Sequence, residues 1–342
     1  GSYEHYSRHA LVKRAALFDF IFAVSDITRE EFLFLEPKTD PKKIKVVYNG
    51  LSIETVPYER KLKAIDGIRE YCRRLFNFRP DFILTHVTRL VRSKAIWRDI
   101  RFLYHLDEQM ERMGKTGFYL ILSTLVGGGR HPDLIQRMET EYGWPVLHRE
   151  GWPDLVGPES EIYHQLLLFN ARSRALKGVF VNQFGFDTNS CGQRLPKNVD
   201  LTDLRLASDV EFGLSIYEPF GIAQLETLPF GGLPLITTTC GCAGLLKETM
   251  KPHDYLAVDF TTIPKEFQDQ FQTNRDFKKI SKELRDQIET VLCASNAITV
   301  ANELPKTDKE RKNRFQSLQK RSSVLDWEHV AKKIADILSP ST

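Results

Sequence analysis

The feature that most constrains the fold of this chain is a regular alternation between short apolar segments and longer amphipathic ones. Short apolar runs without polar interruptions are typical of strands that are buried on both faces. The predicted strands are Phe82–Val87, Phe118–Leu122, Pro145–His148, Gly178–Phe184, Val210–Ser215, Leu233–Thr237 and Leu256–Phe260. The helices predicted between them are Ile96–Met113, His131–Tyr142, Glu159–Leu176, Ile222–Pro229 and Ala243–Met250. This order predicts an α/β fold with a doubly wound parallel sheet covered by helices on both faces.

The two ends of the chain do not follow this alternation. At the N-terminus, residues 3–17 predict an amphipathic helix, and Phe20–Val24 and Lys42–Tyr48 are predicted strands. At the C-terminus, the predicted helices Phe277–Asn302, Lys306–Arg321 and Trp327–Leu338 follow one another without strands between them. The α/β sheet is therefore expected to carry additional C-terminal helices.

Composition narrows the class of protein. Apolar residues make up 42% and charged residues 27% of the chain, as in an ordinary soluble enzyme. With 48 basic and 45 acidic side chains the net charge is +3, which gives no general reason to expect a nucleic-acid partner. No run of apolar residues approaches the length of about 20 residues that a transmembrane helix needs. The five cysteines lack zinc-type spacing, and Cys240 and Cys242 lack the two-residue spacer of a redox motif. We therefore expect free thiols and a cytoplasmic location.

Two glutamates lie close to the expected ligand-binding edge of the sheet. In doubly wound sheets, ligands bind beyond the carboxyl ends of the strands. After the strand that ends near Ser215, Glu218 and Glu226 lie on either side of Gly221. A helix beginning at this glycine presents free N–H groups to a phosphate, and the missing side chain lets the ligand approach closely. Glu226 can accept hydrogen bonds from ribose hydroxyls. For one glutamate alone, a solvated carboxylate is the simpler interpretation, but the combined pattern favours a nucleotide site.

The same segment carries a family resemblance. Glu218–Glu226, followed by Gly232–Thr238, resembles the Glu-x7-Glu signature of retaining glycosyltransferases with the GT-B fold, such as glycogen and starch synthases. The resemblance implies two Rossmann-like domains and a nucleotide diphosphate sugar as donor substrate. It also implies that Glu218 contacts the donor sugar. The donor-binding residues that it implies are Phe220, Gly221, Ile222 and Glu226.

A second stretch agrees with this resemblance. The strand Phe82–Val87 runs into a loop with Arg89 and Lys94, which looks like the Gly-Arg-Leu-x-x-x-Lys-Gly loop of the family. Two cations suit a diphosphate whose negative charge grows as the glycosidic bond breaks. The departures are Thr88 and Ala95, where glycines are usual. The resemblance implies front-side attack with the leaving phosphate as base, without a bound metal or other cofactor. The catalytic residues that it implies are Arg89, Lys94 and Glu218.

Weaker matches extend the resemblance over most of the chain. Residues 3–31 and 44–50 are similar to the end of the acceptor domain of the family, and Asp326–Glu328 looks like the start of its C-terminal crossover helix. Gly127–Arg130 occupies the place of a glycine-bearing loop, whereas Thr239–Ala243 departs from the usual Gly-Gly pair. The resemblance predicts three parts: the tail end of an acceptor domain over residues 1–54, a nucleotide-sugar-binding Rossmann-like domain over residues 55–325, and a crossover helix over residues 326–342.

The leading hypothesis is therefore the donor-binding half of a retaining enzyme that transfers a hexose to a glucan or another glycan acceptor. Only about 50 residues precede the predicted donor-binding domain, and these are too few for a second doubly wound domain. We therefore expect this chain to need the missing acceptor domain or a second copy of itself, and to be inactive alone. The alternative is a catalytically silent nucleotide-sugar-binding or scaffolding domain, which the departures at Thr88, Ala95 and Cys242 favour. A nicotinamide dehydrogenase is disfavoured because no Gly-x-Gly-x-x-Gly opens a helix after a first strand.

Overall fold

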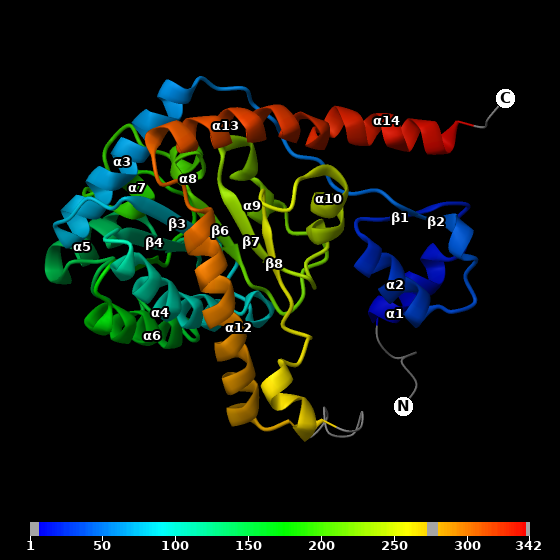
Figure 1. Cartoon of the computed structure of the whole chain (residues 1–342), viewed down its shortest axis with the longest axis horizontal. Coiled ribbons are helices and arrows are strands. Elements are labelled where there is room, and N and C mark those ends of the chain that lie inside the picture. Colours follow the sequence, from blue (N-terminus) through cyan, green and yellow to red (C-terminus); the bar gives the residue numbers. More distant parts are fainter. Residues whose placement is uncertain (1–6, 272–279, 340–342) are drawn as a thin grey trace.

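The computed structural model describes residues 7–271 and 280–339, and it contains a main α/β domain with a smaller N-terminal piece beside it (Figure 1). The main sheet has six parallel strands in the order β5-β4-β3-β6-β7-β8. Their bounds are β3 Phe82–Val87, β4 Gly117–Leu122, β5 Leu176–Val181, β6 Val210–Gly213, β7 Leu233–Thr237 and β8 Leu256–Val258. The predicted doubly wound parallel sheet is confirmed.

Helices cover both faces of this sheet because successive strand residues point to opposite sides. In β3, Phe82 and Leu84 belong to one apolar core, and Ile83 belongs to the other. The first core is covered by α4 (Ile96–Arg112), α6 (Glu159–Arg172) and α12 (Lys282–Glu303). The second is covered by α3 (Tyr58–Phe76), α5 (Pro132–Tyr142), α7 (Thr188–Cys191), α8 (Leu201–Ala207) and α13 (Asp308–Ser322). In Figure 1 the first group lies below the sheet, and α3, α8 and α13 lie above it.

The strand order creates one place where loops diverge. The sheet starts at β3, continues outward through β4 and β5, and then returns to the other side of β3 with β6. In the register of this central pair, Leu84 lies beside Val210 and Thr85 beside Glu211. At such a reversal, the loops at the carboxyl ends of the two strands turn to opposite faces and leave a crevice for a ligand. The site is therefore expected beyond the ends of β3 and β6.

The N-terminal piece contacts the main domain at Pro219 and at Glu248. It consists of α1 (Ser7–Ala15), β1 (Ile21–Ala23), α2 (Asp26–Leu35), the 3-10 helix η2 (Pro41–Lys43) and β2 (Ile44–Val46), with β1 and β2 parallel. Ser25 caps α2 by accepting a hydrogen bond from Thr28 N at 3.2 Å. Its hydroxyl donates to Pro219 O at 2.7 Å. The Tyr48 hydroxyl donates to Asp26 Oδ2 at 2.6 Å, and burial raises the pKa of this tyrosine.

The end of the chain returns to this N-terminal piece (Figure 1). After η6 (Ser323–Leu325), α14 runs over Trp327–Leu338 and is capped by Asp326, whose carboxylate accepts from Glu328 N at 2.9 Å. The backbone of Leu51 donates to Leu325 O at 2.7 Å. Trp327 packs on Gly50, where an added Cβ would lie 2.8 Å from both the Trp327 backbone and its ring. The final helix is observed at its predicted bounds, and its assignment as a crossover helix stays a prediction.

One predicted strand is wrong. Residues 145–148 form turns and not a strand. The reason is a buried polar network: Trp144 donates through Nε1 to Asn182 Oδ1 at 2.8 Å, and His148 Nδ1 lies 2.8 Å from Asp154 Oδ1. These side chains bond to one another and to the end of β5, and Pro145 has no N–H to donate to a neighbouring strand.

Other differences concern helices. The predicted helix Ile222–Pro229 ends early, as α9 (Ile222–Leu225) followed by the 3-10 helix η4 (Leu228–Phe230). The short helices α7 and α8 were not predicted. Two further helical segments on either side of β8 are α10 (Cys242–Thr249) and the 3-10 helix η5 (Lys265–Gln270). The predicted helices over residues 3–17 and 277–302 lie partly outside the described residues. Of the helices that are described, none has the length and apolarity to cross a membrane.

The contact between Trp327 and Gly50 gives a test of how the chain ends are joined. We expect Gly50→Ala to lower the free energy of unfolding by about 1–3 kcal/mol, because the new methyl group would overlap the start of α14. Gly127→Ala is the matched control, since nothing lies within 4 Å of its added Cβ. Urea denaturation measures both variants. Equal stability of the two would show that α14 does not pack closely on this glycine.

Candidate functional site

The two predicted motifs meet beyond the ends of β3 and β6. The loop after β3 leads through the 3-10 helix η3 (Arg92–Lys94) into α4, and the segment after β6 leads to Glu218. The backbone of Ile216 donates to Ser93 O at 2.8 Å, which joins the two loops directly. The strand reversal therefore brings residues more than 100 positions apart in the sequence to one edge.

Lys94 and Glu218 contact one another in this crevice. The Lys94 ammonium group forms an ion pair with the Glu218 carboxylate, and Lys94 is only 8% exposed. Burial lowers the pKa of Lys94, and the neighbouring Arg89 guanidinium acts in the same direction. A pair of opposite charges that is largely shielded from water interacts more strongly than one on the surface. The structure thus unites one predicted catalytic residue from each motif, whereas their contacts to a diphosphate and a sugar stay predictions.

Arg89 belongs to the same loop and is exposed. Its charge lies close enough to act on Lys94, so the loop carries two neighbouring cations, as the motif predicts. Ala95, where a glycine is usual in the motif, has φ +50 and starts α4. This residue therefore retains the left-handed backbone that a glycine would favour, although it carries a methyl group.

Gly221 occupies a position that only glycine fits. Its φ is +95, and an added Cβ would lie 2.7 Å from Cys240 Sγ and 3.2 Å from Glu218 Cγ. The Phe220 side chain points into an apolar core with Tyr48 and is 3% exposed. Phe220 can therefore offer a ligand its backbone but not its ring.

The loop after β7 holds this segment in place through the backbone. Glu218 N donates to Thr239 O at 3.2 Å, and Gly241 N donates to Glu218 O at 2.9 Å. Cys242 N donates to Phe220 O at 2.8 Å. These bonds align the two segments side by side, so the residues that replace the Gly-Gly pair of the family support the Glu218 backbone.

The helix that follows Gly221 is a single turn. Because α9 spans only Ile222–Leu225, its dipole is much weaker than that of the predicted longer helix, and a phosphate would depend more on the cations of the β3 loop. The exposed Ile222 lies at its start. Sequence reasoning missed Gln224, whose buried amide lies against Gly213 and Gly221. Within the described residues, neither polar atom of that amide has a hydrogen-bond partner.

Glu226 is held by a cation that the sequence did not reveal as part of the site. Arg205, from α8, forms an ion pair with the Glu226 carboxylate and lies 3.0 Å from Glu211 Oε1. Glu211 is fully buried, whereas the side chain of Glu226 is 43% exposed. Glu226 can therefore keep its pairing with Arg205 and still present an oxygen to solvent or a ligand. The one available signal was the presence of an acidic residue within the apolar strand β6.

Arg98 positions the segment that carries Glu218. Its guanidinium donates to Leu214 O and Ser215 O, both at 3.2 Å, and to Glu289 Oε1 at 2.9 Å. It also lies over the ring of Phe260, 4.2 Å from the centroid. A buried arginine on α4 thus joins the carboxyl end of β6 to α12.

The glycine-bearing loop after β4 holds a cation that is already engaged. Arg130 is fully buried and forms an ion pair with Glu159 at 2.7 Å. It also donates to Pro153 O at 2.7 Å. The loop therefore anchors the buried network between β4 and β5, and its arginine is not available to a diphosphate.

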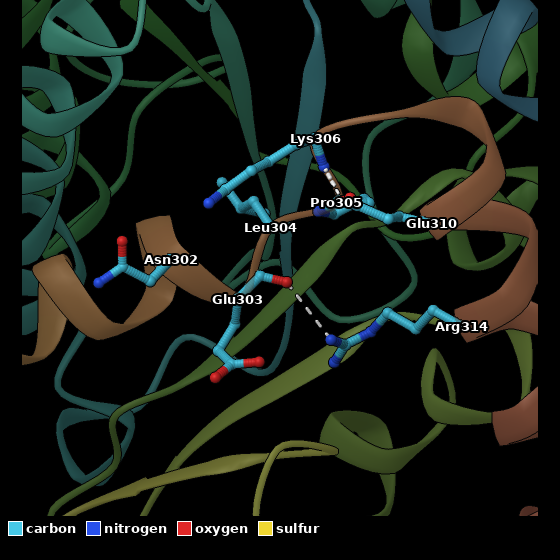
Figure 2. A pocket seen from close by; sticks show the side chains of 7 residues that line it. All are labelled: Asn302, Glu303, Leu304, Pro305, Lys306, Glu310 and Arg314. Atoms are coloured by element: carbon cyan, nitrogen blue, oxygen red, sulfur yellow. Dashed lines mark hydrogen bonds between the residues drawn. The ribbon is translucent and has the colours of Figure 1, made fainter.

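A cavity of about 240 Å³ lies elsewhere, at the turn between α12 and α13 (Figure 2). Figure 2 shows Arg314 directed at Glu303, whose carbonyl it reaches at 3.4 Å, and Lys306 N bonded to Glu310. Arg314 also donates to Gly231 O, at 3.1 Å, just before β7 begins. The cavity therefore lies at the amino ends of the strands, opposite the candidate site. Its lining residues are Asn302, Glu303, Leu304, Pro305, Lys306, Glu310 and Arg314.

Possible metal ligands are not gathered at the site. Over residues 7–271 and 280–339, no group of three or more His, Cys, Asp or Glu side chains could hold a metal ion. The metal-independent reaction implied by the motifs stays a prediction.

Comparisons with known proteins identify the fold. No family model and no curated protein matches the sequence. An apo structure of OtsA is similar, with 13% identity, a TM-score of 0.54, and coverage of 99% of this chain and 64% of that one. A UDP-forming α,α-trehalose-phosphate synthase from Burkholderia xenovorans has 13% identity, a TM-score of 0.52, and coverage of 96% and 62%. A structure from E. coli, described as trehalose-6-phosphate bound with UDP-2-fluoro glucose, has 15% identity and a TM-score of 0.50. The match covers 97% of this chain and 63% of that one.

These likenesses show the Rossmann-like α/β fold. The chain spans less than two thirds of the length of each of these structures. The sequence motifs and the crevice, rather than the likenesses, must therefore carry any assignment of function.

Arg98 provides a test of how the site is supported. We expect Arg98→Ala to lower the free energy of unfolding by about 3 kcal/mol, because two buried carbonyls would lose a charged donor and Glu289 would lose a partner. Arg137→Ala is the control. It removes an exposed ion pair with Glu141 and should leave the free energy of unfolding nearly unchanged. If chemical denaturation gave both variants the same small loss, Arg98 would not anchor the end of β6.

Proposed function

We propose that this chain is the donor-binding part of a retaining glycosyltransferase that transfers a hexose from a nucleotide diphosphate sugar to a glycan or another acceptor. The observation that carries the proposal is the meeting of the Arg89–Lys94 loop and the Glu218–Glu226 segment at the strand reversal, with Lys94 and Glu218 in contact. The resemblance assigns these two motifs to the diphosphate and to the sugar with its ribose.

The residues of the crevice match the parts of such a donor. Arg89 and Lys94 would bind the diphosphate, and the Gly221 backbone leaves room for it. Glu218 would hold the sugar hydroxyls, and Glu226, oriented by Arg205, would accept from the ribose. A donor diphosphate would draw Lys94 away from Glu218, which frees the carboxylate for the sugar. Binding and orientation of the two ends of the donor are thereby linked.

The reaction that we propose uses these groups to stabilise charge. The bond between the sugar C1 and the diphosphate oxygen breaks, and the acceptor oxygen forms its bond to C1 on the same face. The acceptor proton passes to the departing phosphate oxygen. Negative charge grows on that phosphate, where the exposed Arg89 and the buried Lys94 would supply positive charge. The resemblance to retaining enzymes, and not the geometry, supplies the stereochemical outcome.

The alternative, a silent nucleotide-sugar-binding domain, has less support. It depends on the side chains at Thr88, Ala95 and Cys242, where the family favours glycine. Ala95 takes a left-handed backbone, so its loop can retain the shape that the glycine would give. Cys242 donates its N–H to Phe220 O and so supports the site backbone. Neither the departure at Ala95 nor that at Cys242 removes a group that the proposed chemistry needs.

UDP is the first ligand to test, since one structure of similar fold is bound with UDP-2-fluoro glucose. We expect Arg89→Ala and Lys94→Ala each to weaken UDP binding by about 1–3 kcal/mol, because each removes a charged donor to the diphosphate. Arg92→Ala, an exposed cation of the same loop, is the matched control and should change the affinity less than about twofold. Calorimetry measures all four proteins. A parental affinity in both of the first two variants would remove the basis for this site.

The two glutamates should respond differently in the same assay. Glu226→Ala should weaken binding of UDP and ADP alike but leave inorganic pyrophosphate unaffected, because it removes the ribose contact. Glu218→Ala should bind UDP at least as tightly as the parent, since Lys94 loses a competing carboxylate. It should also lose any preference for UDP-glucose over UDP. A variant with weaker UDP binding and an intact preference would contradict the role that we give Glu218.

Transfer itself should need more than this chain. In the proposed enzyme, the acceptor binds between two Rossmann-like domains, and residues 1–54 supply only a small part of the second. We therefore expect the 342-residue chain to bind a nucleotide sugar without transferring its sugar to a glucan. The assay is release of UDP from UDP-glucose with and without glycogen, together with analysis of the glucan product. Elongation at ordinary enzymatic rates by this chain alone would show that the missing-half interpretation is wrong.

A further inference from the structure

Two buried cysteines lie directly behind the Glu218 segment. Cys240 lies in the loop after β7, and Cys242 is the first residue of α10. Their sulfur atoms are 3.3 Å apart, and only Gly241 separates them in the sequence. Cys240 Sγ lies 3.1 Å from Phe220 O and would lie 2.7 Å from a Cβ added at Gly221. The pair is therefore in contact with the backbone that the proposed donor site uses.

We propose that Cys240 and Cys242 form a reversible disulfide when the protein meets a hydroperoxide, and that this bond displaces the Glu218–Gly221 segment. The motifs of the proposed function do not involve either sulfur. The covalent step stands apart from that function, whereas its effect on nucleotide binding rests on it.

The surroundings make Cys240 the sulfur that reacts first. The hydrogen bond from the Cys242 thiol lowers the pKa of Cys240, and the positive charge of Lys94 acts in the same direction. A thiolate is the reactive form of cysteine. By contrast, the hydrogen bond with Cys240 raises the pKa of Cys242, and burial raises the pKa of Cys72, Cys191 and Cys293.

The chemistry balances with hydrogen peroxide as oxidant. The Cys240 thiolate attacks one peroxide oxygen, an S–O bond forms, the O–O bond breaks, and the hydroxide that leaves takes a proton to become water. The Cys242 sulfur then attacks the Cys240 sulfenic acid, an S–S bond forms, the S–O bond breaks, and a second water leaves with the thiol proton. In total, two thiols lose two electrons and one peroxide becomes two waters.

Forming the bond must move the site backbone. A disulfide holds its sulfurs about 2.05 Å apart, so the two atoms approach each other by more than about 1 Å. Gly241 N is bonded to Glu218 O, and Cys242 N to Phe220 O. A shift of either cysteine is thus transmitted to the segment that it supports. A disulfide that closes across one residue is strained, which is typical of bonds that thiols reduce readily.

The covalent step can be read on one peptide. Trypsin releases residues 206–247, which contain Cys240 and Cys242 and no other cysteine. After treatment of the reduced protein with a few equivalents of hydrogen peroxide, we expect this peptide to lose the mass of two hydrogens and to resist alkylation. Dithiothreitol should restore both thiols. Retention of two alkylatable thiols, with oxidation elsewhere or none, would overturn the proposal.

The structural step is measured by amide hydrogen exchange of residues 217–222. Peroxide should increase exchange there in the parent and in Cys191→Ser, a matched control with a buried cysteine on α7. It should leave exchange unchanged in Cys240→Ser and in Cys242→Ser, each compared with its own reduced form. A disulfide that forms without any change in this segment would refute the displacement.

The effect on binding separates this proposal from the proposed function. We expect oxidation to weaken UDP binding by about tenfold in the parent and in Cys191→Ser, and by less than about twofold in the two serine variants at 240 and 242. If the reduced parent binds no UDP while the disulfide and the exchange response are present, the donor-site assignment fails and the redox response stands. If reduced and oxidised parent bind UDP equally, oxidation does not control the site.

Discussion

One buried carboxylate joins the parts on which this architecture depends. Glu211, in β6, accepts from Val87 N at 3.0 Å and from the Thr85 hydroxyl, and so bonds to the neighbouring strand at the point where the sheet reverses. Arg205 forms an ion pair with Glu211 and a second one with Glu226. A buried charge is tolerated only with such partners, and removal of one partner typically costs about 3–5 kcal/mol. The register that places the β3 loop beside the Glu218 segment therefore depends on a group that no motif identified.

The parts of the fold that could be predicted are those that local pattern specifies. The bounds of β3 and β7 agree with the sequence, and a proline or glycine lies just before each apolar run, Pro80 before β3 and Gly232 before β7. The strand predicted over residues 145–148 is wrong because apolar composition does not distinguish a strand from a loop whose side chains bond to distant residues. There His148 and Trp144 reach the end of β5, at Phe180 O and Asn182.

The site shows the same division between local and distant information. Spacing within a motif indicated Lys94, Glu218 and Glu226, but not that Lys94 and Glu218 pair with each other. Their contact joins residues 124 positions apart and follows from strand order, which the sequence leaves open. Arg98 has the same character, since its partners are backbone carbonyls at the end of β6. Carbonyls have no sequence signature, so a positioning arginine of this kind becomes visible only in the structure.

Two contacts link the N-terminal piece to the same segment and extend this dependence beyond the main domain. Ser25 donates to Pro219 O, next to Glu218, and the Tyr217 hydroxyl donates to Glu31 Oε2 at 2.5 Å. Both bonds originate in or at the start of α2, so the residues on either side of Glu218 are fixed in part by residues 1–54. In the glycosyltransferase that we propose, this arrangement would couple the orientation of Glu218 to the position of the N-terminal piece. The N-terminal piece is thus part of the support of the site, because a shift of α2 would be transmitted through these two bonds to the residues beside Glu218.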